Sequence, residues 1–328
     1  MAQAEQDRAV RTDGVRTVLV TGATGFVGTA VRAALRAHGV PVRLRLLSRA
    51  AGGADTVVGD LADPGSLAGA ATGADVLVHL AAQVAGDDAA CAAVNVDGTT
   101  ALLREARRAG VQRIVQLSTT AVYGRGPHHG IAVDGVAAAP VSAASRTRLL
   151  GERAALEAGA VVLRAPLMVG HGDRWVVPFL AELVRRVPAR WAGGTAPVSM
   201  VAVEDLARLI AALALATGPL HGGVFHAGHP VPVCSGALLD ALAGCGVLDP
   251  VPVRDWEWER CLARLAQVPG RVTERQFELV GLPHWYRSEE IWRLAGVDPG
   301  PGVLRRLPAA APWYREHLGR TEAAGSGV

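Results

Sequence analysis

Short apolar runs recur along the chain, and most of them are followed by a longer stretch in which apolar residues have helical spacing. Seven runs predict strands, at 18–20, 42–47, 55–58, 76–80, 111–117, 161–163 and 223–227. Helices are expected between and after them, at 29–38, 64–71, 89–110, 140–158, 175–187 and 288–295. One more helix is expected to follow a short strand in the segment 199–206 and to end at Ala216. Strands that alternate with helices of these lengths predict a doubly wound α/β fold with a parallel sheet. Ligands of such sheets bind at the carboxyl ends of the strands.

The pattern divides the chain into three parts. Residues 1–15 have no hydrophobic segment and predict a flexible tail rather than a signal peptide. Residues 16–170 predict a dinucleotide-binding Rossmann domain. Residues 171–320 predict a smaller, mixed and mainly substrate-binding part, from which a segment at about 198–227 returns to the sheet domain. This last part holds five of the seven tryptophans, which suit either internal packing or a wall for a large flat substrate.

Composition narrows the function classes. The net charge of the 328-residue chain is only +3 and there is no long run of one sign, which argues against nucleic acid as a partner. The longest apolar run is too short to span a membrane. Four scattered cysteines form no C-x-x-C pair, so we expect a reducing, cytoplasmic setting without a metal. There is no lysine, so all 33 basic residues in the Lys+Arg count are arginines. A small-molecule partner is expected, and the oligomeric state is left open.

The glycine-rich stretch Thr21–Gly28 lies between the first strand and the first helix. Gly22 permits a tight turn, Gly25 lets the backbone approach a pyrophosphate, and Gly28 lets the helix pack closely on the strand. The positive end of the helix then faces the phosphates. We expect the loop to bind a dinucleotide through these glycines and their neighbours Thr24, Phe26 and Val27.

The ends of the next strands bear on which dinucleotide binds. The second strand runs into Ser48 and Arg49, where an arginine suits the 2′-phosphate of NADPH and an acidic residue would suit NADH. NADPH is therefore favoured and NADH remains possible, the alternative being an arginine that only faces solvent. After the fourth strand, the small residues Ala81 and Ala82 leave room for a flat cofactor. His79, within that strand, is interpreted as a hydrogen-bonded core histidine.

Together these segments resemble the extended short-chain dehydrogenase/reductases, the NAD-dependent epimerase/dehydratase family. The matching stretches, in order over about 20–210, are TGATGFVG, GDL, HLAA, NVDGT, STTAVYG, LRAPLMVG and VSMVAVEDLA. The resemblance implies a pyrophosphate site at the three glycines and a substrate carbonyl beside Thr119, with Ser118 as a weaker candidate. It also implies cofactor contacts from residues at the ends of later strands, namely Asp60, Leu61, Leu80, Ala81, Ala82, Pro166, Leu167 and Met168.

The chain departs from the family where the chemistry is expected. Members carry Y-x-x-x-K in the helix after strand five, and Ser142 and Arg146 stand there instead. A serine hydroxyl is a poor general acid near pH 7, and an arginine can bind a ribose hydroxyl but does not readily release a proton. Tyr123 is the nearest remaining phenol, in a V-Y-G turn whose expected role is structural; it is also a candidate replacement acid.

Three hypotheses follow. The first is an NADPH-dependent ketoreductase of antibiotic biosynthesis that acts on a polycyclic aromatic polyketide, with the proton supplied by a substrate hydroxyl and with Arg293 as a substrate contact. In lacking the tyrosine, the chain is similar to atypical members of the family, among them reductases of angucyclinones in simocyclinone biosynthesis. The second is a 4-ketoreductase or epimerase of nucleotide-linked deoxysugars. The third is a non-catalytic NADP-binding sensor.

Overall fold

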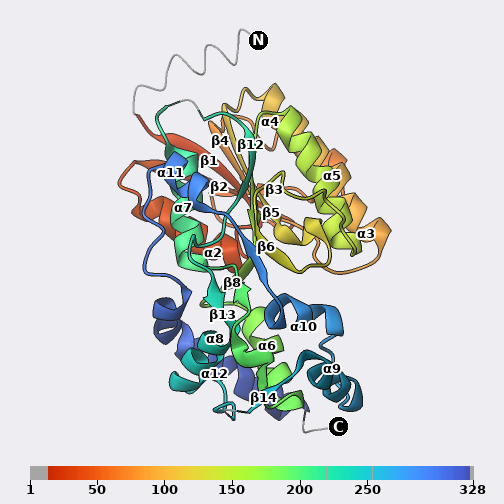
Figure 1. The fold of residues 1–328 in the computed structure, drawn as a ribbon. Helices are drawn as coiled ribbons and strands as arrows, with labels where there is room; N and C mark the ends of the chain where they lie inside the picture. Colours follow the sequence, from red (N-terminus) through yellow and green to blue (C-terminus); the bar gives the residue numbers. More distant parts are fainter. Residues whose placement is uncertain (1–13, 219, 253, 326–328) are drawn as a thin grey trace.

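A computed structural model describes residues 14–218, 220–252 and 254–325, so most of the predicted tail lies outside the described residues (Figure 1). The main feature is a seven-stranded parallel sheet with the order β12-β7-β5-β4-β1-β2-β3. Its strands are β1 (Arg16–Thr21), β2 (Val42–Ser48), β3 (Thr56–Val58), β4 (Val76–His79), β5 (Arg113–Thr119), β7 (Val161–Ala165) and β12 (Gly223–His226). The prediction of a doubly wound Rossmann sheet is confirmed.

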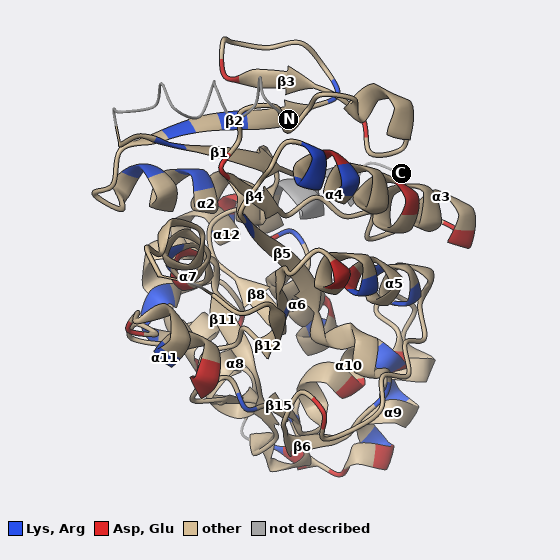
Figure 2. Ribbon diagram, turned by 90° about the horizontal axis from the view of Figure 1, so that it is seen from above, with Lys and Arg blue, Asp and Glu red and all other residues tan. Residues whose placement is uncertain are grey.

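The central strands are apolar because helices cover both faces of the sheet. Val18, Leu19 and Val20 in β1 have no exposed surface, as parallel strands of this kind require. One face packs against α2 (Phe26–Ala37), α7 (Val203–Leu215) and α11 (Glu289–Ala295), and the other against α4 (Thr99–Arg108) and α5 (Ala143–Glu157). Figure 2 shows these two groups on opposite sides of the sheet. The strand order reverses between β1 and β4, which opens a crevice at their carboxyl ends.

Two predicted helices differ from the structure. The helix expected at 64–71 is only a 3₁₀ turn, η1 (Pro64–Leu67), because Gly69 has φ of 75° and ends it. The long helix expected at 89–110 comprises α3 (Asp88–Ala92), a π-helical turn η2 (Ala93–Gly98) and α4. In η2, the side chain of Asn95 binds the backbone N–H and C=O of Gln83 and the hydroxyl of Thr147. The irregular turn thus fixes the loop after β4 against α5.

The C-terminal half has a second hydrophobic core below the sheet (Figure 1). Its helices are α6 (Val176–Arg186), α8 (Ser235–Gly244), α9 (Trp258–Gln267), α10 (Glu274–Gly281) and α12 (Val303–Gly325). Two small sheets connect the halves: β6 (His128–Ile131) with β10 (Pro197–Val198), β13 (Val233–Cys234) and β15 (His284–Tyr286), and β8 (Leu167–Val169) with β11 (Met200–Ala202). A third small sheet, of β9 (Arg190–Trp191) and β14 (Asp255–Trp256), lies within the C-terminal half.

Polar contacts join the C-terminal helix to both halves. Asp205 on α7 is almost fully buried and accepts from Arg306 of α12 and Arg208. Tyr314 of α12 donates to Asp173, whose carboxylate also accepts from the first backbone N–H groups of α6. These bonds hold α12 against the starts of α7 and α6.

Candidate active site

The glycine loop has the form of a phosphate cradle. Gly22 has φ of 65°, and a Cβ there would lie 2.8 Å from the backbone nitrogen of Ala81. A Cβ on Gly28 would lie only 2.0 Å from the carbonyl oxygen of Gly22. Gly25 caps α2 without a side-chain hydrogen bond, and the first turn has no acidic residue. The N–H groups at the start of α2 therefore face the crevice with no side chain competing for an anion.

The other loop residues surround this cradle. Thr24 is exposed, Phe26 is half-buried, and Val27 is buried against the sheet. Val27 and Gly28 thus anchor the helix, while the backbone from Gly22 to Gly25 is left toward the crevice. The residues present fit a dinucleotide pyrophosphate, since the loop is built from glycines with close backbone contacts and the first turn of α2 has no acidic residue.

The loop after β4 is held against the glycine turn by a buried hydroxyl. Thr21 Oγ1 accepts from the backbone nitrogens of Leu80 (3.2 Å) and Ala81 (3.1 Å), and lies 2.7 Å from His79 Nδ1. His79 Nε2 lies 3.0 Å from Thr99 Oγ1. Burial, and next the charge of Arg148, lower the pKa of His79 to about 4. His79 is thus a neutral core residue, as interpreted from the sequence, and the backbone of Leu80 and Ala81 lies against Gly22.

The predicted adenosine contacts lie at the ends of β2 and β3. Ser48 ends β2, and its hydroxyl accepts from Ala50 N at 3.3 Å. Arg49 is exposed, and within the described part of the chain its guanidinium has no hydrogen bond or ion pair. Asp60 accepts from Ala62 N, which orders the turn beside the buried Leu61. Arg49 therefore has a free guanidinium at the edge where the family binds the adenosine ribose.

Thr119 ends β5 and lines a cavity of about 440 Å³. Pro166 and Leu167, predicted to hold the nicotinamide, line the same cavity, while Met168 pairs with Val201 in the adjoining small sheet. The remaining walls come from segments distant in sequence: Thr120, Ala121, Gly124, Val198, Ser199, Thr273, Arg275, Gln276, Leu279, His284 and Tyr286. The structure thus brings Thr119 together with the predicted nicotinamide contacts, and adds α10 and β15, which the sequence did not indicate.

Ser118 points away from this cavity, because successive strand residues face opposite sides of a sheet. It donates a very short hydrogen bond to Glu152 of α5. Glu152 in turn binds Arg164 of β7, whose Nη1 donates to the hydroxyl of Tyr123 at 2.8 Å. The Tyr123 oxygen lies 2.7 Å from His226 Nε2 of β12. We call Ser118, Glu152, Arg164, Tyr123 and His226 the polar row.

The polar row is buried and bound within itself. Ser118 and Arg164 are register partners on β5 and β7, and His226 is the partner of Arg164 on β12. Burial raises the pKa of Tyr123, whose hydroxyl also contacts the carbonyl of Val133. The structure therefore assigns Tyr123 and Ser118 to the packing of the sheet ends, and neither lines the cavity of Thr119.

Ser142 and Arg146 are engaged in contacts of their own. Ser142 is the N-cap of α5: its hydroxyl accepts from Ser145 N at 3.1 Å, and Ser145 returns a bond to the backbone of Ser142. Arg146 is exposed and binds Asp88 of α3 at 2.7 Å. Neither residue lines the cavity at Thr119.

Arg148, which the sequence analysis did not single out, faces the sheet instead. Its Nη2 donates to the carbonyl of Leu117 at 3.0 Å, one residue beyond Gln116, the last residue of β5 that pairs with β4. Its charge contributes to the lowered pKa of His79. The signal was available in the helical spacing of Ser145, Arg148, Glu152 and Ala155, which share one face of α5.

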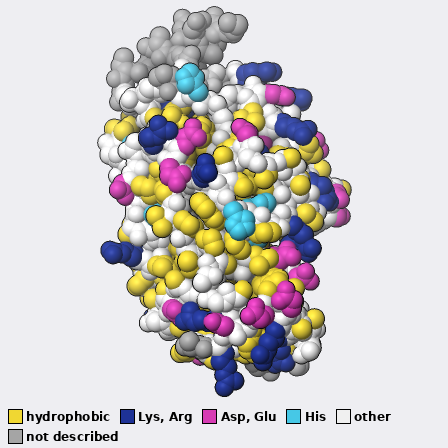
Figure 3. Space-filling model, viewed as in Figure 1, with side chains coloured by type: hydrophobic (Ala, Val, Ile, Leu, Met, Phe, Trp, Pro, Cys, Tyr) yellow, Lys and Arg dark blue, Asp and Glu magenta, His cyan; other side chains and the backbone are white. Residues whose placement is uncertain are grey.

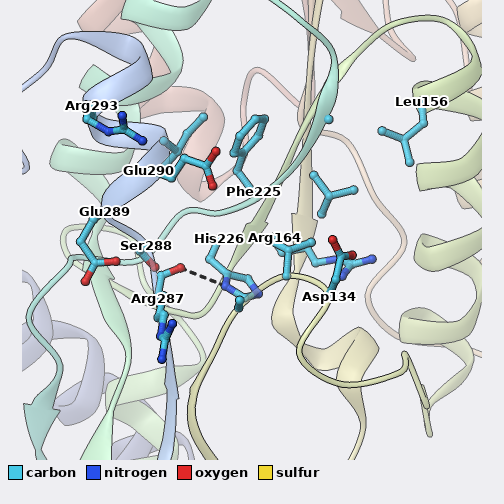
Figure 4. A pocket seen from close by; sticks show the side chains of 15 residues that line it. Asp134, Leu156, Arg164, Phe225, His226, Arg287, Ser288, Glu289, Glu290 and Arg293 are labelled. Carbon is cyan, nitrogen blue, oxygen red and sulfur yellow. Dashed lines mark hydrogen bonds between the residues drawn. The ribbon is translucent and has the colours of Figure 1, made fainter.

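A larger cavity, about 920 Å³, lies along the outer edge of β12 (Figure 4). Arg293, the proposed substrate contact, lines this cavity together with Arg287, Glu290 and Asp134. None of its lining residues belongs to the glycine loop or to the cavity at Thr119. The larger cavity thus shares no lining residue with the expected site of chemistry, and we place the reaction in the smaller one.

The tryptophans of the C-terminal part serve packing. Trp292 is buried in the sheet-side core and donates to the carbonyl of Gly228 at 2.7 Å. Trp256, Trp258 and Trp313 pack against the second core. Trp285 covers Gly130, where a Cβ would lie 2.3 Å from its ring. None of these side chains lines the cavity at Thr119, so the packing alternative accounts for them in this structure and a tryptophan wall for the substrate stays a prediction.

The surface and the absence of metal clusters limit other functions. The face in Figure 3 carries acidic and basic side chains interspersed, with hydrophobic side chains between them. Within residues 14–325 apart from 219 and 253, no three His, Cys, Asp or Glu side chains are placed to hold a metal ion. Of the helices described, none has the length and apolar character needed to cross a bilayer.

A glycine cradle at a helix N-terminus, an open crevice at the strand reversal and a cavity beside Thr119 define an oxidoreductase of the Rossmann class that binds a nicotinamide cofactor. The NAD dependent epimerase/dehydratase family matches residues 18–228, and the chain belongs to this family. The predicted family and the prediction of an enzyme are thereby confirmed.

Relatives span most of the chain. A 2-alkyl-3-oxoalkanoate reductase of Stenotrophomonas maltophilia is 30% identical over 334 residues, which cover 90% of this chain and 99% of that protein. A 4-hydroxy-2-methyl-3-oxo-4-farnesyl-3,4-dihydroquinoline-1-oxide ketoreductase of Stigmatella aurantiaca is 31% identical over 190 residues, 53% of this chain and 57% of that protein. A short-chain dehydrogenase/reductase superfamily protein of Agrobacterium tumefaciens, solved with bound NAD, has a TM-score of 0.70 at 25% identity and covers 94% of this chain and 100% of that one.

Proposed function

We propose that the protein is a cytoplasmic, NADPH-dependent ketoreductase that acts on a polycyclic aromatic polyketide of the angucyclinone type in antibiotic biosynthesis. The observation that carries this proposal is that, within the described part of the chain, the hydroxyls nearest to the expected acid position are already engaged in other contacts. Ser142 is used as a helix cap, Tyr123 is held in the polar row, and the hydroxyl of Tyr286 is bonded to Thr120. Burial raises the pKa of Tyr286 to about 12, which makes it a weak acid. The proton is then best supplied by the substrate.

The proposed chemistry needs a ketone that is flanked by an ortho or peri hydroxyl, to which it is hydrogen bonded internally. A nicotinamide cofactor bound at the glycine cradle would supply the hydride that reaches the carbonyl carbon. The internal hydrogen bond of the substrate places its phenolic proton on the carbonyl oxygen, so the alcohol forms as the phenol becomes a phenolate. The phenolate then takes up a proton from solvent. Thr119 has only to hold the carbonyl oxygen in place.

The binding surfaces suit a ring system. Pro166, Leu167, Val198 and Leu279 supply apolar walls, and Tyr286 stacks at 5.7 Å on Tyr123 behind the cavity. The printed name of the Stigmatella relative describes a 3-oxo group beside a 4-hydroxyl on a fused ring. For the cofactor, the unpaired Arg49 supports NADPH, because a guanidinium binds a 2′-phosphate through several N–H groups.

The decisive assay compares two ketones that differ in one methyl group. NADPH oxidation is measured with 8-hydroxy-1-tetralone and with its 8-O-methyl ether. We expect turnover of the hydroxy ketone, and a decrease of at least about a hundredfold for the ether, which has no proton to give. Equal rates for the two ketones would refute a proton supplied by the substrate.

A nucleotide-deoxysugar 4-ketoreductase or epimerase is the second candidate. The cavity beside Thr119 is lined by several polar side chains, including Ser199, Thr273 and Gln276, which a sugar could use. Turnover of a thymidine-diphosphate-linked 4-keto sugar, without turnover of the hydroxy ketone, would favour this function. Tight NADPH binding without turnover of any ketone would favour a sensor.

A further inference from the structure

One wall of the cavity at Thr119 is formed by α10, and this helix presents a half-buried cation to it. Arg275 lines the cavity, and among the residues that the structure describes its guanidinium has no hydrogen bond or ion pair. The acid one turn further along, Glu278, instead lies 3.6 Å from Arg125. Burial, and then the nearby Arg125, lower the pKa of Arg275, and the charge of Glu278 offsets part of this decrease.

The other polar side chains of the cavity are already bonded. Ser199 Oγ accepts from Tyr286 N at 2.9 Å, and His284 Nδ1 lies 3.2 Å from the carbonyl of Leu282. Thr273 and Gln276 bind one another in the capping box that starts α10. Arg275 is thus the side chain of this cavity with the largest unused capacity to donate hydrogen bonds.

The position of α10 is fixed from behind. The guanidinium of Arg186 is buried and donates to the carbonyls of Leu265 (2.6 Å), Val268 (2.8 Å) and Val272 (2.7 Å). The carboxylate of Glu182 accepts from the backbone nitrogens of Arg271 and Val272. These bonds order the segment that leads into α10, so the cation on its first turn is presented without a further ordering cost.

We propose that Arg275 recognises an anionic oxygen of the substrate. This inference rests on the proposed function in one respect, the placement of the substrate in the cavity of Thr119. A guanidinium in a half-dry cavity favours an ionised ligand over a neutral one of equal shape. The oxygen we favour is an ionised phenol or enol of an aromatic ring system, and the phosphate of a nucleotide sugar offers the same chemistry.

Binding of defined probes to the full chain saturated with NADP⁺ tests the inference. The probes are 2-hydroxy-1,4-naphthoquinone, which is an anion at neutral pH, its neutral methyl ether, and uridine diphosphate, each titrated by calorimetry. We expect the wild-type protein to bind the naphthoquinone anion about ten- to a hundredfold more tightly than the ether. Arg275→Gln removes this preference, and Arg275→Lys keeps part of it as a point charge.

Arg271→Gln is the matched control, because Arg271 is exposed four residues earlier and does not line the cavity. It keeps the full preference. Unchanged NADP⁺ affinity in all variants shows that they are folded. If, of the two anions, only uridine diphosphate binds in a way that depends on Arg275, the proposal that Arg275 recognises an anionic oxygen is supported, and that oxygen belongs to a phosphate. A preference that survives Arg275→Gln, or no binding of either anion, overturns the inference.

The two proposals fail separately. Loss of the anion preference in Arg275→Gln, with no reduction of 8-hydroxy-1-tetralone by the wild type, leaves the recognition site intact and refutes the proposed reaction. If the wild type reduces the tetralone and the preference for the anion is unchanged in Arg275→Gln, only the role of Arg275 is refuted.

Discussion

Arg164 and Glu152 form a buried ion pair between β7 and α5. Nη2 of the arginine lies 2.7 Å from Oε2 of the glutamate, and Nε lies 3.2 Å from both carboxylate oxygens. Both side chains are at least nine-tenths buried. Removing one charge leaves the other without a partner in a medium that solvates it poorly, at a cost of about 3–5 kcal/mol.

Glu152→Gln should therefore lower the free energy of unfolding by about 3–5 kcal/mol in a urea titration. The surface pair of Glu105 and Arg108 provides the control: Glu105→Gln should change the same quantity by less than about 1 kcal/mol. Similar losses for the two variants would show that the polar row contributes little to stability.

Gly28→Ala should abolish cofactor binding. The added Cβ would stand 2.0 Å from the Gly22 carbonyl oxygen, so α2 must move away from the loop that holds the pyrophosphate. We expect the dissociation constant for NADPH, followed by fluorescence, to rise at least about tenfold. Gly244→Ala, at the end of α8 with open space around it, should bind NADPH as the wild type does. Normal NADPH affinity in Gly28→Ala would exclude the cradle as the phosphate site.

Arg49→Ala should weaken NADPH binding and leave NADH binding unchanged. A charge-assisted contact to the 2′-phosphate contributes about 1.5–3 kcal/mol, which is roughly ten- to a hundredfold in affinity. Arg43, exposed near the start of the same strand, gives the matched variant Arg43→Ala, which should leave both affinities unaltered. The assignment of NADPH fails if the ratio of the two dissociation constants does not change in Arg49→Ala.

Thr119→Val should reduce turnover by about a hundredfold with little effect on NADPH affinity, because the hydroxyl positions only the substrate oxygen. In the wild type, Ala121 N donates a hydrogen bond to Thr119 Oγ1 at 3.1 Å. The variant loses this bond, so the free energy of unfolding should fall by about 1 kcal/mol. Thr119→Ser keeps the hydroxyl and should retain most of the activity. Equal losses of kcat and of cofactor affinity would place the reaction elsewhere.

Stability should fall in mild acid because His79 and His226 are buried in the neutral form. Burial lowers the pKa of each to about 4, below the 6.5 of the unfolded chain. Between these values the unfolded state binds more protons than the native state, so the free energy of unfolding decreases as pH falls from about 6.5 to 4. The expected loss is roughly 3 kcal/mol per histidine, and none above pH 7.

Urea titrations at pH 7, 6, 5 and 4.5 measure this decrease. His226→Gln should be less stable than the wild type at pH 7, since it loses the contact with Tyr123, but its stability should fall less steeply with acid. If the free energy of unfolding of this variant falls as steeply with decreasing pH as that of the wild type, His226 does not contribute to the acid sensitivity.

The parts that sequence predicted are those set by neighbouring residues. The strand at 18–20, the turn at Gly22 and the helix after Gly25 depend on local spacing, and the structure has them where expected. The walls of the cavity depend on pairings between distant segments, such as His284 of β15 with His128 of β6, and local spacing carries no record of those. This is why α10 and Tyr286 were missed.

The rotation of α5 about its axis explains why Ser142 and Arg146 do not line the cavity at Thr119. Counting residues put Ser142 and Arg146 at the catalytic positions, whereas the cap at Ser142 sets the first turn so that Ser145, Arg148 and Glu152 turn toward the sheet. The register of a helix relative to its neighbours is fixed by packing, which a motif spacing alone does not encode.

On one side of the polar row, Arg164 and His226 line the larger cavity (Figure 4). On the other side, Tyr286 stacks on Tyr123 and lines the cavity of Thr119. The presence of two separate cavities has a consequence for the discovery of inhibitors. A compound selected for the roomier hollow would raise the melting temperature while the enzyme continued to turn over, so a thermal-shift screen should be paired with a competition assay against the ketone.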